Sequence, residues 1–127
     1  MEQHLLSKFQ RFKMSRKSFL KITLLLLLPF FTKAQSQQRK LDSLHTALKM
    51  VTDDTVKMLI VQNLGLHYLE SNRDSALFFT EQFLDLTKKI KQPLWTASGL
   101  SRKAYILQKS GNLPLSFKLL NESKAIL

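Results

Sequence analysis

The sequence predicts an all-helical protein built from antiparallel helical hairpins, and three observations predict this fold class. Beyond residue 35, apolar residues recur every three or four positions, which is the period of a helix. Only three glycines and three prolines occur in the 127 residues, and the predicted connections are short, so neighbouring helices must run antiparallel. Alternating apolar runs bounded by turn residues, which would indicate strands, do not occur.

The first 34 residues have the three parts of a secretory signal peptide. A cationic stretch (residues 14–21) precedes an apolar run (residues 22–31), and Ala34 then leads into a polar segment. This run is shorter than the roughly 20 residues that a helix needs to cross a bilayer. We therefore expect residues 1–34 to be a signal peptide cleaved after Ala34, with residues 1–13 as a start-site extension. The alternatives are an uncleaved membrane anchor and a buried helix.

The net charge of +11 is unevenly distributed. Residues 1–34 hold seven basic side chains and one acidic side chain, and the other 93 residues hold 13 basic and eight acidic ones, giving +6 and +5. The basic run 88–91 falls in the last turn of a predicted helix, where cations oppose the negative end of the dipole. We expect a solvated surface with no nucleic-acid partner, and membrane contact only through an uncleaved signal segment.

The residue pattern after the signal segment predicts five helices. Their apolar stripes have helical spacing, and the first one is an N-terminal helix within residues 35–53. The expected helices cover residues 37–50, residues 54–71, residues 73–91, a segment that begins at Pro93, and a segment that Asn112-Leu113-Pro114 opens and that continues to Leu127.

The predicted helix ends carry residues that suit capping. The tetrad 52–55 offers an Asp or Thr as N-cap for the second helix, and Asn72 precedes the third. Pro93 suits a first turn, where its missing N–H would have had no partner within the helix. Gly111 stands where a left-handed C-terminal cap needs a residue without Cβ.

An internal repeat relates the second helix to the fourth, with a separation of 39–40 residues. The alignment superposes Gly65 on Ala104 and Ala76 on Ser116. Small residues at such positions let two helices cross closely, and larger apolar residues recur on either side of them.

These residues resemble the tetratricopeptide repeat, a unit of two antiparallel helices in about 34 residues. The resemblance covers residues 54–127, although Thr80 stands where a large aromatic is usual and Lys103 departs from an apolar position. It implies two hairpins stacked as a short α-solenoid, against the alternative of an unrelated helix bundle. The matching residues are Leu64, Gly65, Tyr68, Ala76 and Phe83 in the first unit, and Leu100, Ala104, Leu107, Gly111, Ser116, Leu120 and Ser123 in the second.

The repeat spacing and the segment 70–77 also resemble the exported N-terminal arrays of Bacteroidetes-type sensor histidine kinases and related regulators. The resemblance implies an exported chain, periplasmic or anchored in a membrane facing the periplasm, that is the sensory or scaffold part of a truncated signal-transduction protein. The last repeat stops inside its second helix, so we expect self-association through an uncapped C-terminal helix. A stand-alone periplasmic adaptor and a membrane-anchored helical bundle are the alternatives.

The resemblance also implies a groove, lined by the first helix of each hairpin, for a protein or peptide partner. Leu66 and Tyr105 are large residues off the predicted core stripe, which favours exposure for recognition, although they can also pack on a neighbouring helix. The positions that match the groove of the family are Gln62, Leu66, Glu70, Ser101, Tyr105 and Gln108.

Residue patterns that indicate catalysis are missing from the sequence. His4, His45 and His67 are isolated, and the Asp53-Asp54 pair is explained by capping. No phosphate-binding loop or cysteine occurs. We therefore expect a binding protein without catalytic residues, bound metal or cofactor, rather than a small helical enzyme.

Overall fold

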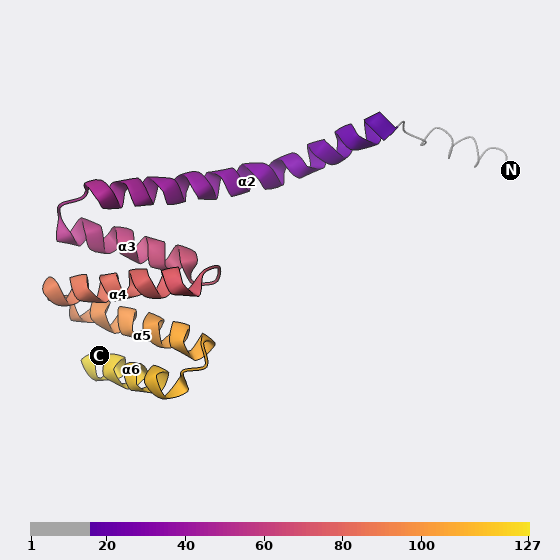
Figure 1. Cartoon of the computed structure of the whole chain (residues 1–127). Coiled ribbons are helices and arrows are strands. Elements are labelled where there is room, and N and C mark those ends of the chain that lie inside the picture. Colours follow the sequence, from indigo (N-terminus) through magenta and orange to yellow (C-terminus); the bar gives the residue numbers. More distant parts are fainter. Residues whose placement is uncertain (1–15) are drawn as a thin grey trace. The chain divides into compact units, whose positions relative to one another are not determined.

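The computed structural model describes residues 16–127, with the side chains of residues 28–31 outside the description, and every regular element in this part is an α-helix (Figure 1). The prediction of an all-helical fold is confirmed for residues 16–127. The predicted start-site extension, residues 1–13, and His4 lie outside the described residues. The helices are α2 (Arg16–Met50), α3 (Asp54–Tyr68), α4 (Arg73–Lys89), α5 (Pro93–Lys109) and α6 (Leu113–Ile126).

Helix α2 differs from the sequence prediction, because it runs without a break through the predicted end of the signal segment and into the predicted first helix. Residues 32–40 contain no glycine or proline and are mostly good helix formers, so nothing local ends the helix there. The chain divides into two compact units, residues 1–39 and 40–127. Residues 40–50 of α2 therefore belong to the second unit, called here the helical unit.

By length and composition, α2 is apolar enough to cross a membrane, and a signal sequence near an N-terminus passes the same test. Several of its large apolar side chains lie open to solvent in the first unit. Phe19, Leu20, Leu24, Leu25 and Leu26 are 65–69% exposed. Such a surface needs a cover, because exposed apolar area of this extent is unfavourable in water.

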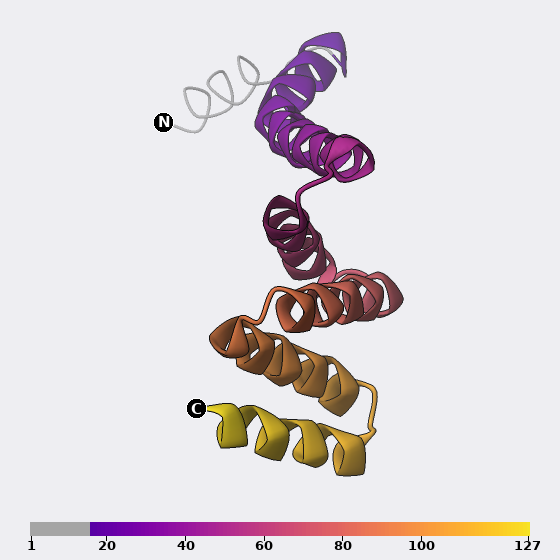
Figure 2. The same cartoon turned by 90° about the vertical axis from the view of Figure 1, so that its left-hand side faces the viewer.

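In the helical unit, helices α3 to α6 follow one another as antiparallel neighbours (Figures 1 and 2). Helix α3 packs against α4, α4 against α5, and α5 against α6. Because the connections are short, each helix packs against the helix that precedes or follows it in the sequence. The result is two hairpins, α3–α4 and α5–α6, joined through the contact of α4 with α5.

The helix starts confirm the predicted capping residues. The Asp53 carboxylate accepts a hydrogen bond from the Val56 amide at 2.9 Å, and the Asn72 side chain accepts one from the Ser75 amide at 3.0 Å. Pro93 occupies the first turn of α5. Each cap satisfies an amide that has no partner inside its helix.

The ends of α4 and α5 use the same left-handed turn. Lys91 has φ 55° and Gly111 has φ 83°, and in each turn the following amide donates to the carbonyl oxygen five residues earlier, at 2.8 and 2.9 Å. Gly111 confirms the predicted C-terminal cap. Helix α4 ends at Lys89 rather than the predicted residue 91, since a left-handed residue cannot continue a right-handed helix.

The main core lies inside the α3–α4 hairpin, where Leu64 and Phe83 are completely buried. Residues of the last turns of α2 cover one side of it, among them Leu41, Leu44 and Leu48. The burial of these large side chains supplies most of the stability of this region, since each contributes roughly 1.5–3 kcal/mol when removed from water.

Small residues lie where helices cross. Ala104 is completely buried, and a Cβ on Gly65 would lie 3.4 Å from the Thr80 hydroxyl oxygen. The closest approach is at a glycine that the repeat alignment did not include. A Cβ on Gly99 would lie 2.7 Å from the Leu84 side chain and 2.9 Å from that of Phe83, so α4 and α5 can meet this closely only at a glycine.

The α5–α6 hairpin has a smaller core and more hydroxyl groups. Its large buried side chains are Leu100, Ile106 and Leu119. The Ser116 hydroxyl donates to the Ala104 carbonyl oxygen, and the Ser123 hydroxyl donates to that of Ala97, both at 2.8 Å. Buried hydroxyls paired in this way are satisfied, so they are compatible with a close helix contact.

Candidate functional site

The six residues of the predicted groove are distributed over α3, the turn that follows it, and α5. Leu66 is 47% exposed and Tyr105 is 36% exposed, while Gln62 is half-buried. Glu70 and Gln108 are also exposed. The side chains of Leu66 and Tyr105 therefore remain accessible in the described part of the chain, and neither is enclosed by a neighbouring helix.

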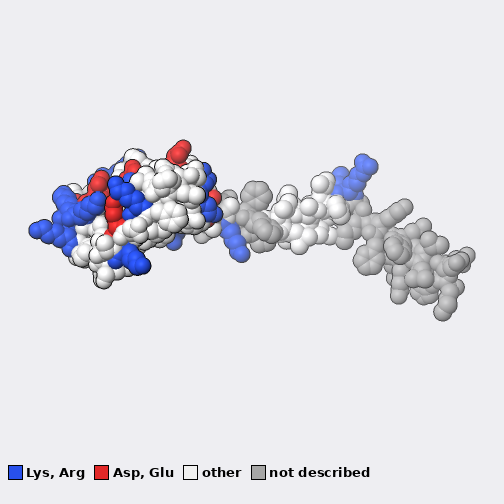
Figure 3. All heavy atoms as spheres, turned by 90° about the horizontal axis from the view of Figure 1, so that it is seen from below, with Lys and Arg blue, Asp and Glu red and all other residues white. Residues whose placement is uncertain are grey.

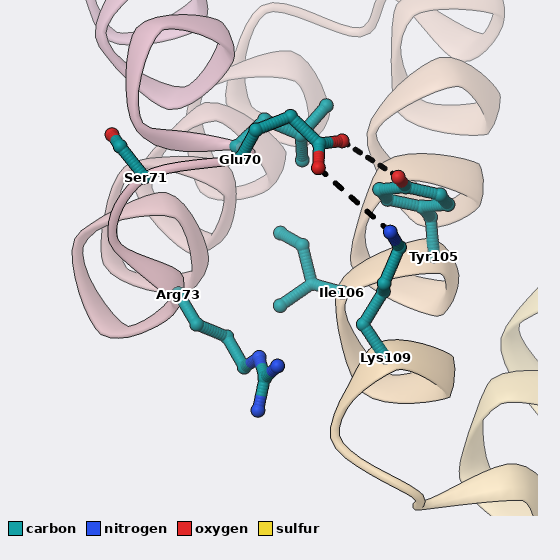
Figure 4. A pocket seen from close by; sticks show the side chains of 7 residues that line it. Glu70, Ser71, Arg73, Tyr105, Ile106 and Lys109 are labelled. Atoms are coloured by element: carbon teal, nitrogen blue, oxygen red, sulfur yellow. Dashed lines mark hydrogen bonds and ion pairs between the residues drawn. The ribbon is translucent and has the colours of Figure 1, made fainter.

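Two of these residues, from different hairpins, meet directly. The Tyr105 hydroxyl donates to Glu70 Oε1 at 2.6 Å, and Lys109 Nζ lies 3.8 Å from Glu70 Oε2 (Figure 4). Lys109 Nζ also lies 5.2 Å from the centre of the Tyr105 ring, within the range of a cation–π contact. The contacts join the α3–α4 turn to the last turns of α5.

The electrostatics of this cluster favour a permanent positive charge on Lys109. Its contact with Tyr105, and then the negative charge of Glu70, raise the pKa of Lys109, while the positive charge of Arg73 opposes that shift. Because the ordinary pKa of a lysine is about 10.4, a raised pKa keeps the ammonium group protonated at any physiological pH.

A pocket of about 330 Å³ opens beside this cluster, and we call it the turn pocket. Figure 4 places Arg73 on the α4 side of the opening, Tyr105 and Lys109 on the α5 side, and Ile106 between them. Within the described residues Arg73 makes no hydrogen bond or ion pair. The lining residues are Leu69, Glu70, Ser71, Arg73, Tyr105, Ile106 and Lys109.

The structure does not bring the whole predicted set together. Ser101 lies within hydrogen-bond distance of Ser123 on α6, with the two hydroxyl oxygens 2.9 Å apart. Gln62, Leu66 and Gln108 do not line the turn pocket. Only Glu70 and Tyr105 are shared by the predicted groove and the turn pocket.

Sequence reasoning did not single out Arg73, Lys109 or Arg102. The Arg102 guanidinium carbon lies 5.4 Å from the centre of the Phe83 ring, and burial lowers the pKa of Arg102. Its Nη1 atom is buried without a partner among the described residues, 3.6 Å from where a Cβ of Gly65 would lie. Arg102 therefore reaches from α5 toward α3. Since the repeat alignment follows apolar and small residues, it contains no information about these cations.

The residues weighed as catalytic candidates have structural contacts. Asp54 forms an ion pair with Lys89 at 2.8 Å, which ties the start of α3 to the end of α4. His45 Nε2 lies 3.1 Å from the Tyr68 hydroxyl, and His67 packs edge-on against the Tyr68 ring. Among residues 16–127 no group of three or more metal-ligating side chains is found.

The charged surface of the helical unit carries both signs. Figure 3 shows Lys, Arg, Asp and Glu side chains interspersed over the face that it displays, with uncharged surface between them. Ion pairs across the helices account for part of this pattern, such as Lys103 with Glu81 at 2.9 Å. The face shown carries no large area of one sign, such as a nucleic-acid interface needs.

Comparison with known proteins gives no relative: no protein-family model matches the chain, and neither a curated protein nor a solved structure is significantly similar to it.

Proposed function

We propose that residues 54–127 form a non-catalytic protein-interaction module whose two hairpins act like tetratricopeptide repeats. The supporting observation is that Leu66 of α3 and Tyr105 of α5 are both exposed. Tyr105 also contacts Glu70, which follows α3, and lies near Lys109. We infer that these residues belong to one face, called here the face shared by α3 and α5. A surface that combines large apolar side chains with fixed polar groups suits an extended peptide or a partner helix.

The test is a selection of peptides from a random display library against the full chain in detergent micelles. We expect the selected peptides to bind at least about tenfold more weakly to Leu66→Asp or Tyr105→Ala, because the loss of a large apolar anchor costs over 1 kcal/mol. Phe78→Asp is the matched control, since Phe78 is exposed on α4, outside the shared face. Equal binding to all three variants, or no selected peptide, would contradict the proposal.

We propose that residues 1–34 export the chain to the periplasm or, if uncleaved, anchor it in the membrane facing the periplasm. The exposed apolar side chains of residues 19–27 support this, since the membrane or the export machinery would cover them. Mass spectrometry of the protein expressed in a Gram-negative host tests it. We expect either a mature chain that begins at Gln35 or an intact chain in the membrane fraction. An intact chain in the soluble cytoplasm would contradict export.

We further propose that this module is the sensory or scaffold part of a signal-transduction protein. The resemblance of its repeat spacing to exported arrays of sensor histidine kinases supports this, and a stand-alone periplasmic adaptor is the alternative. The nucleotide sequence downstream of the coding region separates the two. A transmembrane helix and kinase motifs in frame are expected for the first, and their absence favours the adaptor.

A second copy of this chain is the partner that we propose for α6. Its outer side carries Leu113, Phe117 and Leu120, spaced four and three residues apart and all exposed. Such a stripe resembles one side of a helix–helix interface. Light scattering of the full chain in micelles should give a dimer that Phe117→Ser converts to a monomer, while a monomeric wild type would exclude this interface.

A further inference from the structure

We infer that the turn pocket binds a carboxylate group, with Arg73 as the residue that pairs with it. The inference begins with an imbalance of charge around the pocket. Glu70 is its only acidic residue, whereas Arg73 and Lys109 are both basic. The Glu70 carboxylate is already engaged by the Tyr105 hydroxyl and lies near the Lys109 ammonium group. The charges of Glu70 and Lys109 therefore balance each other, and the positive charge of Arg73 has no opposite charge in the pocket lining.

Arg73 offers unused hydrogen-bond donors. A guanidinium group has five N–H donors in a planar fork that matches the two oxygens of a carboxylate. None of these donors is engaged by another described residue. Helix α4 begins at Arg73, so the positive end of the helix dipole lies at the same place and adds to the attraction for an anion.

The position of Lys109 gives the anion a second positive neighbour. Arg73 and Lys109 stand on opposite sides of the opening (Figure 4), and the charge of Arg73 opposes the rise of the Lys109 pKa that Tyr105 and Glu70 cause. An anion placed between the two like charges relieves their repulsion. It would also give Lys109 a hydrogen-bond acceptor closer than Glu70 Oε2, which at 3.8 Å is too distant for a hydrogen bond.

The net charge and size of the pocket favour a single carboxylate over a phosphate. One unpaired positive charge is matched by one negative charge, whereas a doubly charged phosphate would be repelled by Glu70 more strongly than a carboxylate is. The volume of about 330 Å³ lies at the lower limit for ligand pockets. The lining of the pocket is mainly polar, with Leu69 and the Tyr105 ring as a smaller apolar part, so the expected ligand is a carboxylate on a short chain.

The source of the carboxylate is either a free carboxylic acid or the end of a bound peptide. The pocket lies beside Tyr105, which belongs to the face shared by α3 and α5, so a peptide on that face can reach it. Only the peptide source rests on the proposed interaction function. The carboxylate site itself depends on Arg73, Lys109 and the pocket geometry alone.

The experiment is an NMR titration of the full chain in detergent micelles with butyrate, and with butyramide as the neutral molecule of the same shape. We expect saturable shifts of the Arg73 and Ile106 amide signals with butyrate and none with butyramide. Arg73→Gln should weaken butyrate binding about tenfold, because a bidentate charged pair is lost. Lys124→Gln is the control for general charge, since Lys124 is exposed on α6.

A second variant, Glu70→Gln, tests the electrostatic argument because it should strengthen binding instead of weakening it. Glu70→Gln removes the negative charge while it keeps a hydrogen-bond acceptor for Tyr105, so butyrate should bind about fivefold more tightly. Shifts that are equal for butyrate and butyramide, or affinity that neither Arg73→Gln nor Glu70→Gln changes, would overturn the inference. Because butyrate is not a peptide, this result does not depend on whether the module binds peptides.

The two sources are distinguished with a tetrapeptide of alanines and its C-terminal amide. A peptide source predicts that the free peptide binds at least about tenfold more tightly than butyrate, and that Leu66→Asp removes this gain. A free-acid source predicts that butyrate and the peptide bind alike and that Leu66→Asp has no effect. Both results support a carboxylate site. A C-terminal amide that binds as well as the free peptide argues against it.

Discussion

The α3–α4 hairpin and the α5–α6 hairpin share one pattern of helix, turn and helix but differ in how their apolar side chains are covered. Leu64 and Phe83 of the first hairpin are completely buried, and residues 40–50 lie over that core. In the second hairpin α6 presents Phe117 to solvent, with 65% of it exposed. A hairpin can thus form by local pairing, but a third layer decides whether its outer side is buried.

The two hairpins also differ in what joins their helices. The first uses aromatic rings, since Tyr68 and Phe79 stack with 5.8 Å between ring centres. The second uses serine hydroxyls that donate to backbone carbonyls. Aromatic burial contributes more free energy than a satisfied hydroxyl, so the first hairpin should be the more stable of the two.

Phe83→Ala should show the largest effect. The ring is completely buried on α4 and also contacts Trp95 and Arg102 of α5, so its removal should lower the free energy of unfolding by about 3–5 kcal/mol. Urea unfolding followed by circular dichroism measures this. Leu94→Ala, at an exposed position of α5 in the second hairpin, should change it by less than about 0.5 kcal/mol. Similar losses for the two variants would contradict the comparison.

Gly99→Ala should have the next largest effect on the free energy of unfolding. The added Cβ would lie 2.7 Å from the Leu84 side chain, so the buried Leu84 and Phe83 side chains, or the helices that carry them, must shift, at a cost of about 1–3 kcal/mol. Gly65→Ala meets only an ordinary contact at 3.4 Å, and alanine favours the helix by up to about 1 kcal/mol. Thermal unfolding should therefore rank Gly65→Ala at or above the wild type. If Gly65→Ala is destabilised, α3 and α4 lie closer together than the 3.4 Å contact indicates.

Ser123→Ala tests the hydroxyl contacts of the second hairpin. The variant removes the bond to the Ala97 carbonyl oxygen and the contact with Ser101, and it should cost about 1 kcal/mol in urea unfolding. Ser98→Ala is the matched control, because Ser98 is exposed on α5. Should Ser123→Ala prove as stable as that control, the hydroxyl contacts would not be what holds α6.

Lys91→Gly should give the smallest change in the free energy of unfolding, and this change should be a gain in stability. Lys91 holds the same left-handed conformation as Gly111, with φ 55°, and a side chain is disfavoured there by about 1–2 kcal/mol. The greater freedom of glycine in the unfolded chain offsets part of this, so we expect a gain of about 0.5–1 kcal/mol. Gly111→Ala should lose a similar amount, and a stabilised Gly111→Ala would show that the turn is not strained.

The helix boundaries could be predicted closely wherever a local residue decides them. Asp53, Asn72 and Pro93 mark helix starts because a capping bond or a missing N–H acts within one turn of the chain. Errors occurred where no such residue stands. Helix α2 continues past residue 34 because no helix-ending residue occurs there. Helix α4 ends early because Lys91 adopts a left-handed conformation, which a lysine in the sequence does not predict.

The candidate site could be predicted only in part. Glu70 and Tyr105 were expected to face one groove, and the structure places them in direct contact. Ser101 was expected in the same groove. It lies four residues before Tyr105 on the same face of α5, exposed and within hydrogen-bond distance of Ser123 on α6. The turn pocket instead takes in Arg73 and Lys109, because the place where a pocket opens depends on how α4 and α5 pack, which the apolar pattern of one helix does not specify.

The sequence by itself determined that the chain is helical, where most helices begin, and which neighbours pair, because periodicity, caps and short turns act between residues close in the chain. The tertiary structure alone decided that Arg73 at the start of α4 shares a pocket with Lys109 at the end of α5. Those two residues belong to different hairpins, and their meeting depends on how α4 crosses α5. That crossing is set by the Phe83 ring and by the missing side chain of Gly99, whose effects exist only once the helices have packed.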